Sequence, residues 1–106
     1  MEKRKAHYQL KEIKAAFADP DTLAHVTVSA RNGARELRLS DEDIVAVIQA
    51  LRTRDLSKSM TVYRDSTLWQ DVYCPTYKRM KLYVKFAKER ETDVYWLVSF
   101  KKNEQD

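Results

Sequence analysis

Residues 80–86 read Met-Lys-Leu-Tyr-Val-Lys-Phe, a strict alternation of apolar and polar side chains that decides the fold class. Successive side chains of a strand point to opposite faces, so this stretch predicts a strand, continuing to residue 88, with one apolar face. The other face carries Lys81, Tyr83 and Lys85. The apolar face has to be buried, which requires a second layer from elsewhere in the chain.

Three more stretches have the β-branched and aromatic composition of strands: residues 59–64, 68–74 and 94–101. Short polar segments and a loop around Pro75 separate the four strands. Strands that follow one another through short connections pair as neighbours, so we expect an antiparallel meander.

Two helices are predicted before the meander. Residues 8–18 repeat apolar side chains at helical spacing, and Pro20 ends this helix because proline lacks a backbone donor. Ser40, followed by three acidic residues, is typical of a helix N-terminus. Arg52 and Arg54 are predicted to close this second helix, because positive charge is favourable at a helix C-terminus.

The segment between the two helices has a mixed pattern. Residues 23–29 are rich in β-branched side chains and are predicted as a short strand, and Asn32-Gly33 is predicted as a turn. The stretch from residue 30 to residue 39 is ambiguous. Helices followed by a consecutive sheet predict an α+β fold, a single domain over residues 1–106 with N-terminal helices packed on a mainly antiparallel C-terminal sheet.

The composition excludes several kinds of site. One glycine in 106 residues leaves no Gly-rich loop for a nucleotide phosphate. One cysteine and two histidines are too few for a zinc site without carboxylates, so we predict no metal and no cofactor. The longest apolar runs are five residues, far short of the roughly twenty of a membrane helix. With a charged N-terminus unlike a secretory signal, we expect a cytoplasmic protein without membrane contact.

The positive charge is concentrated in one part of the chain. The net charge is +4 overall and +5 over residues 78–102. Lysines that flank the Tyr83 ring suit RNA, because ammonium groups neutralise phosphates and the ring can stack on an unpaired base. The same residues are also common on the solvated outer face of a strand. The residues alone therefore indicate a basic α+β domain that binds RNA or another partner.

The stretch from residue 58 to residue 75 is dense in chemically versatile side chains, but each has a structural explanation. Trp69 fits a half-buried packing position, and Asp65 and Asp71 fit turn or cross-strand pairing. Cys74 fits a small buried residue because no base accompanies it in the sequence. The two histidines, far apart in the chain, fit surface or packing positions.

Several ordered blocks run nearly from one end of the sequence to the other: Met1-Glu2-Lys3-Arg4 with His7, Lys58-Ser59-Met60-Thr61 with Tyr63, Asp65 and Thr67, Trp69-Gln70-Asp71-Val72-Tyr73 with Pro75, Tyr83 with Lys85, and Val98-Ser99-Phe100-Lys101. In these blocks the sequence resembles the MqsR toxins, the motility quorum-sensing regulator family of bacterial type II toxin–antitoxin systems.

The resemblance implies a RelE-like fold and an mRNA interferase that cuts messenger RNA without the ribosome. It further implies inhibition by an MqsA-type antitoxin, which is expected to contact promoter DNA in place of the toxin, and a preference for GCU-type triplets. The functional groups of the family match Lys58, Gln70 and Tyr83, with Met60 in the active-site neighbourhood. Two positions depart from the family, because Ser57 replaces a tyrosine and Cys74 replaces an arginine.

A reaction without metal is compatible with these residues, because the 2′-hydroxyl of RNA can attack the adjacent phosphorus itself. We expect Lys58 to stabilise the transition state, Gln70 to orient phosphate or base, and Tyr83 to transfer a proton. Lys81 and Lys85 are expected to bind the substrate and to favour the ionised form of Tyr83.

Two other functions compete with the endoribonuclease hypothesis. One is a non-catalytic RNA- or partner-binding module on a degenerate toxin fold, inactivated by a change such as the one at Cys74. The other is a DNA-binding regulator, which is disfavoured because the basic residues lie on predicted strands and the second helix begins with acidic residues.

Overall fold

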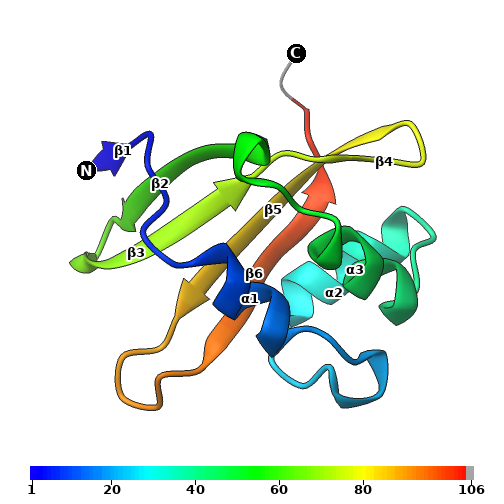
Figure 1. The fold of residues 1–106 in the computed structure, drawn as a ribbon, viewed down its shortest axis with the longest axis horizontal. Helices are drawn as coiled ribbons and strands as arrows, with labels where there is room; N and C mark the ends of the chain where they lie inside the picture. Colours follow the sequence, from blue (N-terminus) through cyan, green and yellow to red (C-terminus); the bar gives the residue numbers. More distant parts are fainter. Residues whose placement is uncertain (105–106) are drawn as a thin grey trace.

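A computed structural model describes residues 1–104, and over this range it contains three α-helices and a six-stranded sheet (Figure 1). The elements, in chain order, are β1 (Glu2–Lys3), α1 (Leu10–Ala16), the 3₁₀ turn η1 (Pro20–Thr22), α2 (Val28–Glu36), α3 (Asp41–Gln49), the 3₁₀ turn η2 (Thr53–Asp55), β2 (Leu56–Val62), β3 (Asp65–Tyr73), β4 (Thr76–Tyr77), β5 (Met80–Lys88) and β6 (Tyr95–Lys102). The predicted α+β architecture is confirmed.

The four predicted strands are β2, β3, β5 and β6, and they form the expected antiparallel meander. The sheet order is β1-β2-β3-β5-β4, with β6 paired to β5. Two short strands were missed by the sequence prediction. β1 pairs with the outer edge of β2, and β4 forms a tight hairpin with the start of β5. Each has two residues, too few to show an alternating pattern.

The strand predicted at residues 23–29 is wrong. Of that stretch, Val26 alone makes an isolated parallel bridge, to Leu97 of β6, and α2 begins two residues later. Thr27 is the N-cap of α2, because its side chain accepts a hydrogen bond from the backbone N–H of Ala30 at 3.1 Å. The β-branched residues of this stretch therefore form the start of a helix and not a strand.

The turn predicted at Asn32-Gly33 is also wrong, because both residues lie inside α2. Gly33 is required by packing. A Cβ atom there would lie 1.9 Å from the carbonyl oxygen of Phe100, so any side chain would push α2 away from β6. The glycine permits close approach of a helix to a strand backbone.

The helix start at Ser40 is confirmed. Ser40 and Asp43 form a reciprocal capping box, in which each side chain accepts from the other residue's backbone N–H. The predicted end is wrong, because α3 stops at Gln49. Arg52 and Arg54 lie beyond it, at and within the turn η2 that leads into β2.

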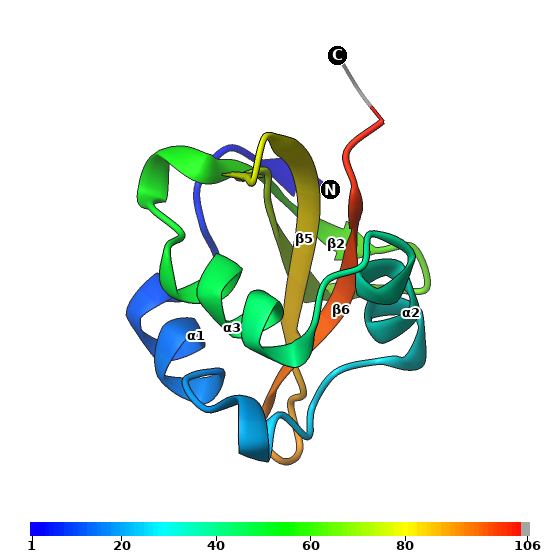
Figure 2. The same ribbon diagram turned by 90° about the vertical axis from the view of Figure 1, so that its right-hand side faces the viewer.

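The core lies between the sheet and the helices, and all three helices contribute buried residues to it. α1 and α3 lie on one side of β5, while α2 lies beside β6 (Figure 2). Phe17 of α1 meets Phe86 of β5 with 5.7 Å between ring centroids, and Ile44 and Ile48 of α3 are fully buried. No helix of the described residues is long and apolar enough to cross a membrane. We call the sheet face turned away from α1 and α3 the open face.

Candidate active site

The register of the sheet aligns lysines in a row across the open face. Lys58 of β2 pairs with Val72 of β3, Val72 with Lys85 of β5, and Lys85 with Ser99 of β6. Directly paired residues project to the same side of a sheet. Two of the predicted site residues, Lys58 and Lys85, are therefore brought to one face from segments far apart in the sequence.

The neighbouring row contains Gln70. Met60 of β2 pairs with Gln70 of β3, Gln70 with Ala87 of β5, and Ala87 with Trp96 of β6. Alternate residues along a strand are about 7 Å apart, so this row lies one pleat from the lysine row. Met60 and Gln70 thus lie directly beside the lysines, as the catalytic prediction requires.

Tyr83 lies on the other side of the lysine row, between two cations. The ammonium of Lys101 is 5.1 Å from the centroid of the Tyr83 ring, and the ammonium of Lys85 is 6.0 Å from it. Lys101 comes from β6, where it pairs directly with Tyr83. Lys81 shares the strand face of Tyr83 but is exposed near the β4–β5 hairpin, so Lys101 takes the place beside the ring that the sequence prediction gave to Lys81.

Lys101 is a cation of this face that the prediction from the residues did not include. It belongs to the C-terminal block that carries the family resemblance, and this was the available signal. Its role depends on the pairing of β5 with β6, which a sequence pattern does not specify.

The expectation that lysines lower the pKa of Tyr83 is wrong. Burial raises the pKa of Tyr83 above its usual value, and the nearby Cys74 thiol raises it further. The net direction is therefore set by desolvation of the phenolate, although Lys85 and Lys101 flank the ring. Tyr83 therefore keeps its proton at neutral pH and is suited to donate it.

Lys85 has the opposite perturbation. Its pKa is lowered below the usual value, first by burial and then by the positive charges of Lys101 and Lys58. Lys85 is half-buried, whereas Lys101 is exposed. At a given pH, a larger fraction of Lys85 is therefore neutral than of a free lysine, and a neutral amine can accept a proton.

Lys58 forms an ion pair with a residue of β1, the strand at the edge of the sheet. Its ammonium lies 3.6 Å from the Oε1 atom of Glu2, and its side chain is 31% exposed. Glu2 reaches this position because β1 pairs with β2. The ion pair orients Lys58 while leaving part of its ammonium accessible to an anion.

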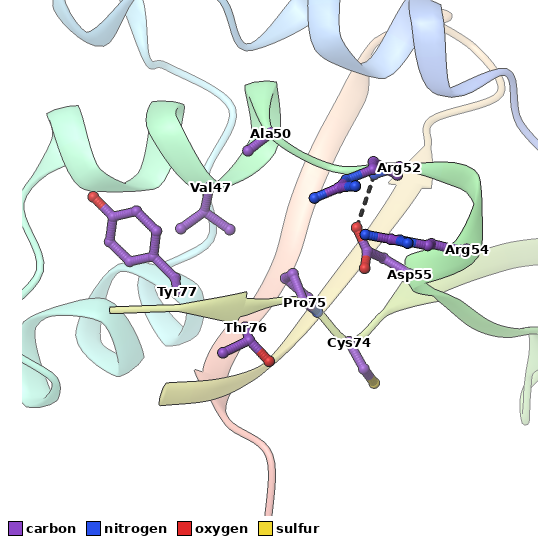
Figure 3. A pocket seen from close by; sticks show the side chains of 9 residues that line it. All are labelled: Val47, Ala50, Arg52, Arg54, Asp55, Cys74, Pro75, Thr76 and Tyr77. Atoms are coloured by element: carbon purple, nitrogen blue, oxygen red, sulfur yellow. Dashed lines mark hydrogen bonds between the residues drawn. The ribbon is translucent and has the colours of Figure 1, made fainter. Parts of the chain in front are cut away.

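The two positions expected to depart from the family pattern, Ser57 and Cys74, lie side by side near Lys58. The Ser57 side chain hydrogen-bonds the Cys74 sulfur, and burial raises the pKa of the thiol. Cys74 is only half-buried, which corrects the prediction of a small buried residue. It also lines a hollow of about 280 Å³ with Arg52 and Arg54 (Figure 3).

The acidic residues of β3 have structural roles, as predicted. The carboxylate of the fully buried Asp71 accepts hydrogen bonds from the backbone N–H groups of His7 and Tyr8, and from the Ser59 hydroxyl at 2.6 Å. Asp65 accepts from Thr67 in the β2–β3 turn. Asp71 thereby fastens the N-terminal segment to the sheet.

The aromatic residue Trp69 and the two histidines also have packing roles. Trp69 is half-buried, with the His7 ring stacked on it at 5.1 Å and the Lys3 ammonium 4.1 Å from its centroid. The exposed His25 meets the ring of Trp96 edge-on, at 5.0 Å between centroids. These positions confirm the packing interpretation of all three residues.

Residues 5–102 match the model of a protein family described as motility quorum-sensing regulator, toxin of MqsA. The chain is also 38% identical over 87 residues to the mRNA interferase toxin MqsR of Escherichia coli (strain K12). That alignment covers 82% of this chain and 87% of the relative.

Proposed function

The chain belongs to the MqsR toxin family, and from this premise we propose that it is a ribosome-independent and metal-independent endoribonuclease that cleaves mRNA at GCU-type triplets. Family membership makes the protein an mRNA interferase toxin of a toxin–antitoxin system. Cleavage of mRNA would inhibit translation and growth.

The proposal rests on one observation, the convergence of Lys58, Gln70 and Tyr83 on the open face of the sheet. They come from three strands and lie in three adjacent rows, with Lys85 and Lys101 among them. A scissile phosphate over the central row would meet several ammonium groups, a neutral amide and a phenol. This set can hold a phosphate and move protons around it.

We assign the steps to these groups in the following way. The 2′-oxygen attacks the adjacent phosphorus and passes its proton to the neutral amine of Lys85. The P–O5′ bond breaks, and the leaving 5′-oxygen takes a proton from Tyr83. Lys58 and Lys101 stabilise the negative charge that accumulates on the phosphoryl oxygens. The products are a 2′,3′-cyclic phosphate and a 5′-hydroxyl, and solvent returns the protons to their starting groups.

Three side chains are assigned to substrate positioning. Gln70 orients the phosphate or its adjoining base through its amide, and Met60 supplies an apolar contact next to it. Lys81 is exposed beyond Tyr83 along β5, where it can contact a phosphate further along the strand of RNA.

The family description names MqsA as the partner of these toxins. We propose that an MqsA-type antitoxin neutralises this protein and that promoter DNA is reached only through the antitoxin. The protein would act in the cytoplasm, where its mRNA substrate is found.

Incubation of the purified protein with a synthetic GCU-containing RNA in EDTA tests the proposal. We expect cleavage by the wild type, and loss of cleavage without loss of folding in Lys58→Ala. A gel shift without any cleavage by the wild type would instead support the non-catalytic binding module.

A further inference from the structure

A groove on the open face lies directly beside Gln70. It has a volume of about 340 Å³, and we call it the Trp96 groove. Its lining includes Leu68, Gln70, Ala87, Glu89, Trp96 and Val98. Apart from Gln70, none of these side chains has a role in the proposed cleavage reaction.

The groove exists because a small residue lies between two large ones. Ala87 of β5 pairs with Gln70 on one side and with Trp96 on the other, so its methyl group forms a floor between two taller side chains. Leu68 and Val98 add apolar walls, and both are only half-buried. The result is an apolar slot with an amide at one wall and an indole at the other.

The indole of Trp96 is held in place before any ligand arrives. Its ring N–H donates to the Oε2 atom of Glu89 at 3.4 Å, and the His25 ring packs edge-on against it at 73° between planes. Trp96 nevertheless remains half-buried, so part of its surface faces solvent. A fixed, partly exposed aromatic ring is suited to stacking, because little side-chain entropy is lost on binding.

The charges around the groove favour a base over a phosphate. The ammonium of Lys88 is already paired, at 3.1 Å from the Oδ1 atom of Asp93 and 3.9 Å from the Oε1 atom of Glu12. The Glu89 carboxylate at the rim would repel a phosphate but can accept from a base N–H, and the Gln70 amide can both donate and accept. The lysine row one pleat away is the place for the phosphates.

We propose that the Trp96 groove binds a nucleobase of the RNA next to the scissile phosphate, stacked on Trp96 and contacted at its edge by Gln70 and Glu89. This inference rests on the proposed endoribonuclease function. A base in the groove would set the register of the RNA, because Gln70 belongs both to the groove and to the catalytic set. Trp96 is thus assigned as a substrate-binding residue that affects sequence preference.

Cleavage kinetics with matched variants and substrates test this assignment. Trp96→Ala should raise KM by about 5- to 100-fold with little change in kcat, as expected for loss of one base–aromatic stack. Trp96→Phe should restore most of the affinity. The control is Tyr63→Ala, which removes a fully exposed aromatic ring at the β2–β3 turn and should leave KM unchanged.

An RNA that lacks one base beside the cleaved bond provides the decisive comparison. The abasic site should raise KM for the wild type, but should add no further penalty in Trp96→Ala, because both changes remove the same contact. An unchanged KM for Trp96→Ala would overturn the assignment. The assignment would also fail if, in Trp96→Ala, an abasic site on either side of the cleaved bond still raised KM as much as it does in the wild type.

A binding measurement separates failure of this inference from failure of the proposed function. In Trp69→Phe, Trp96 is the single tryptophan of the chain. A 2′-O-methyl RNA, which has no attacking hydroxyl, should quench its emission, whereas the abasic version should not. Absence of quenching while anisotropy shows RNA bound would contradict the groove assignment. Absence of cleavage by the wild type, with quenching intact, would contradict only the nuclease.

Discussion

The Lys101 ammonium lies 5.1 Å from the centre of the Tyr83 ring, held there by the direct pairing of the two residues across β5 and β6. This pairing brings the C-terminal strand into the proposed active site. A cation in this position can contact the reacting phosphate while Tyr83 supplies its proton.

Lys101→Ala should reduce kcat/KM for RNA by about 10- to 100-fold, because one charged contact to the phosphate is lost. The matched control is Lys102→Ala, the next exposed lysine, which pairs with the core residue Leu82. Equal effects of the two substitutions on cleavage would mean that only overall charge matters and would contradict the assignment of Lys101.

The pH–rate profile should be bell-shaped with an alkaline optimum. Lys85 must be neutral to accept a proton, so the rate rises as pH increases through its lowered pKa. Tyr83 must be protonated to donate, so the rate falls as pH passes above its raised pKa. Initial rates of RNA cleavage, measured at a series of pH values from 6 to 11, give the profile.

Two variants assign the limbs of this profile. Tyr83→Phe should lower kcat by about 10²- to 10⁴-fold and remove the descending limb, and Lys85→Ala should remove the ascending limb. A wild-type rate that falls steadily above neutral pH would show that Lys85 is needed as a cation instead.

The alternation at residues 80–86 was sufficient to predict β5 and both of its faces, because burial of one sheet face imposes a period of two. The same local reasoning failed at Thr27, since a cap depends on the helix that follows. It also failed to predict the direction of the Tyr83 pKa shift and the position of Lys101 beside the Tyr83 ring. Burial and strand pairing are properties of the fold, and neither can be deduced from neighbours in the sequence.

Asp71→Asn should lower the free energy of unfolding by about 2–4 kcal/mol, because a buried carboxylate loses charge-assisted hydrogen bonds from His7, Tyr8 and Ser59. Urea unfolding measures this loss. Hydrogen exchange should also become faster over residues 1–9.

Asp65→Asn is the control for this prediction, since its partly exposed carboxylate at the start of β3 contacts Thr67 and the Arg90 guanidinium but no group of the N-terminal segment. Its effect on unfolding should be smaller than that of Asp71→Asn. Comparable losses for the two variants would contradict a special role of Asp71 in anchoring the N-terminal segment.

Gly33→Ala should destabilise the protein by about 1–3 kcal/mol, although alanine is the better helix former. The added methyl group would collide with the Phe100 carbonyl oxygen and separate α2 from β6. Thermal unfolding monitored by circular dichroism measures the change. The control is the opposite substitution, Ala46→Gly, within α3. It should destabilise the protein as well, but through the low helix propensity of glycine and not through a steric clash. A Gly33→Ala protein that is more stable than the wild type would contradict the close approach of α2 to the β6 backbone.

The most direct test of metal-free cleavage by the RNA's own hydroxyl is mass spectrometry of the fragments formed from a synthetic GCU-containing RNA in EDTA. The expected products are a 5′ fragment ending in 2′,3′-cyclic phosphate and a 3′ fragment beginning with a 5′-hydroxyl, with none formed when a single 2′-deoxy nucleotide replaces the attacking one. Fragments with a 5′-phosphate, or cleavage of the 2′-deoxy substrate at the same bond, would contradict it.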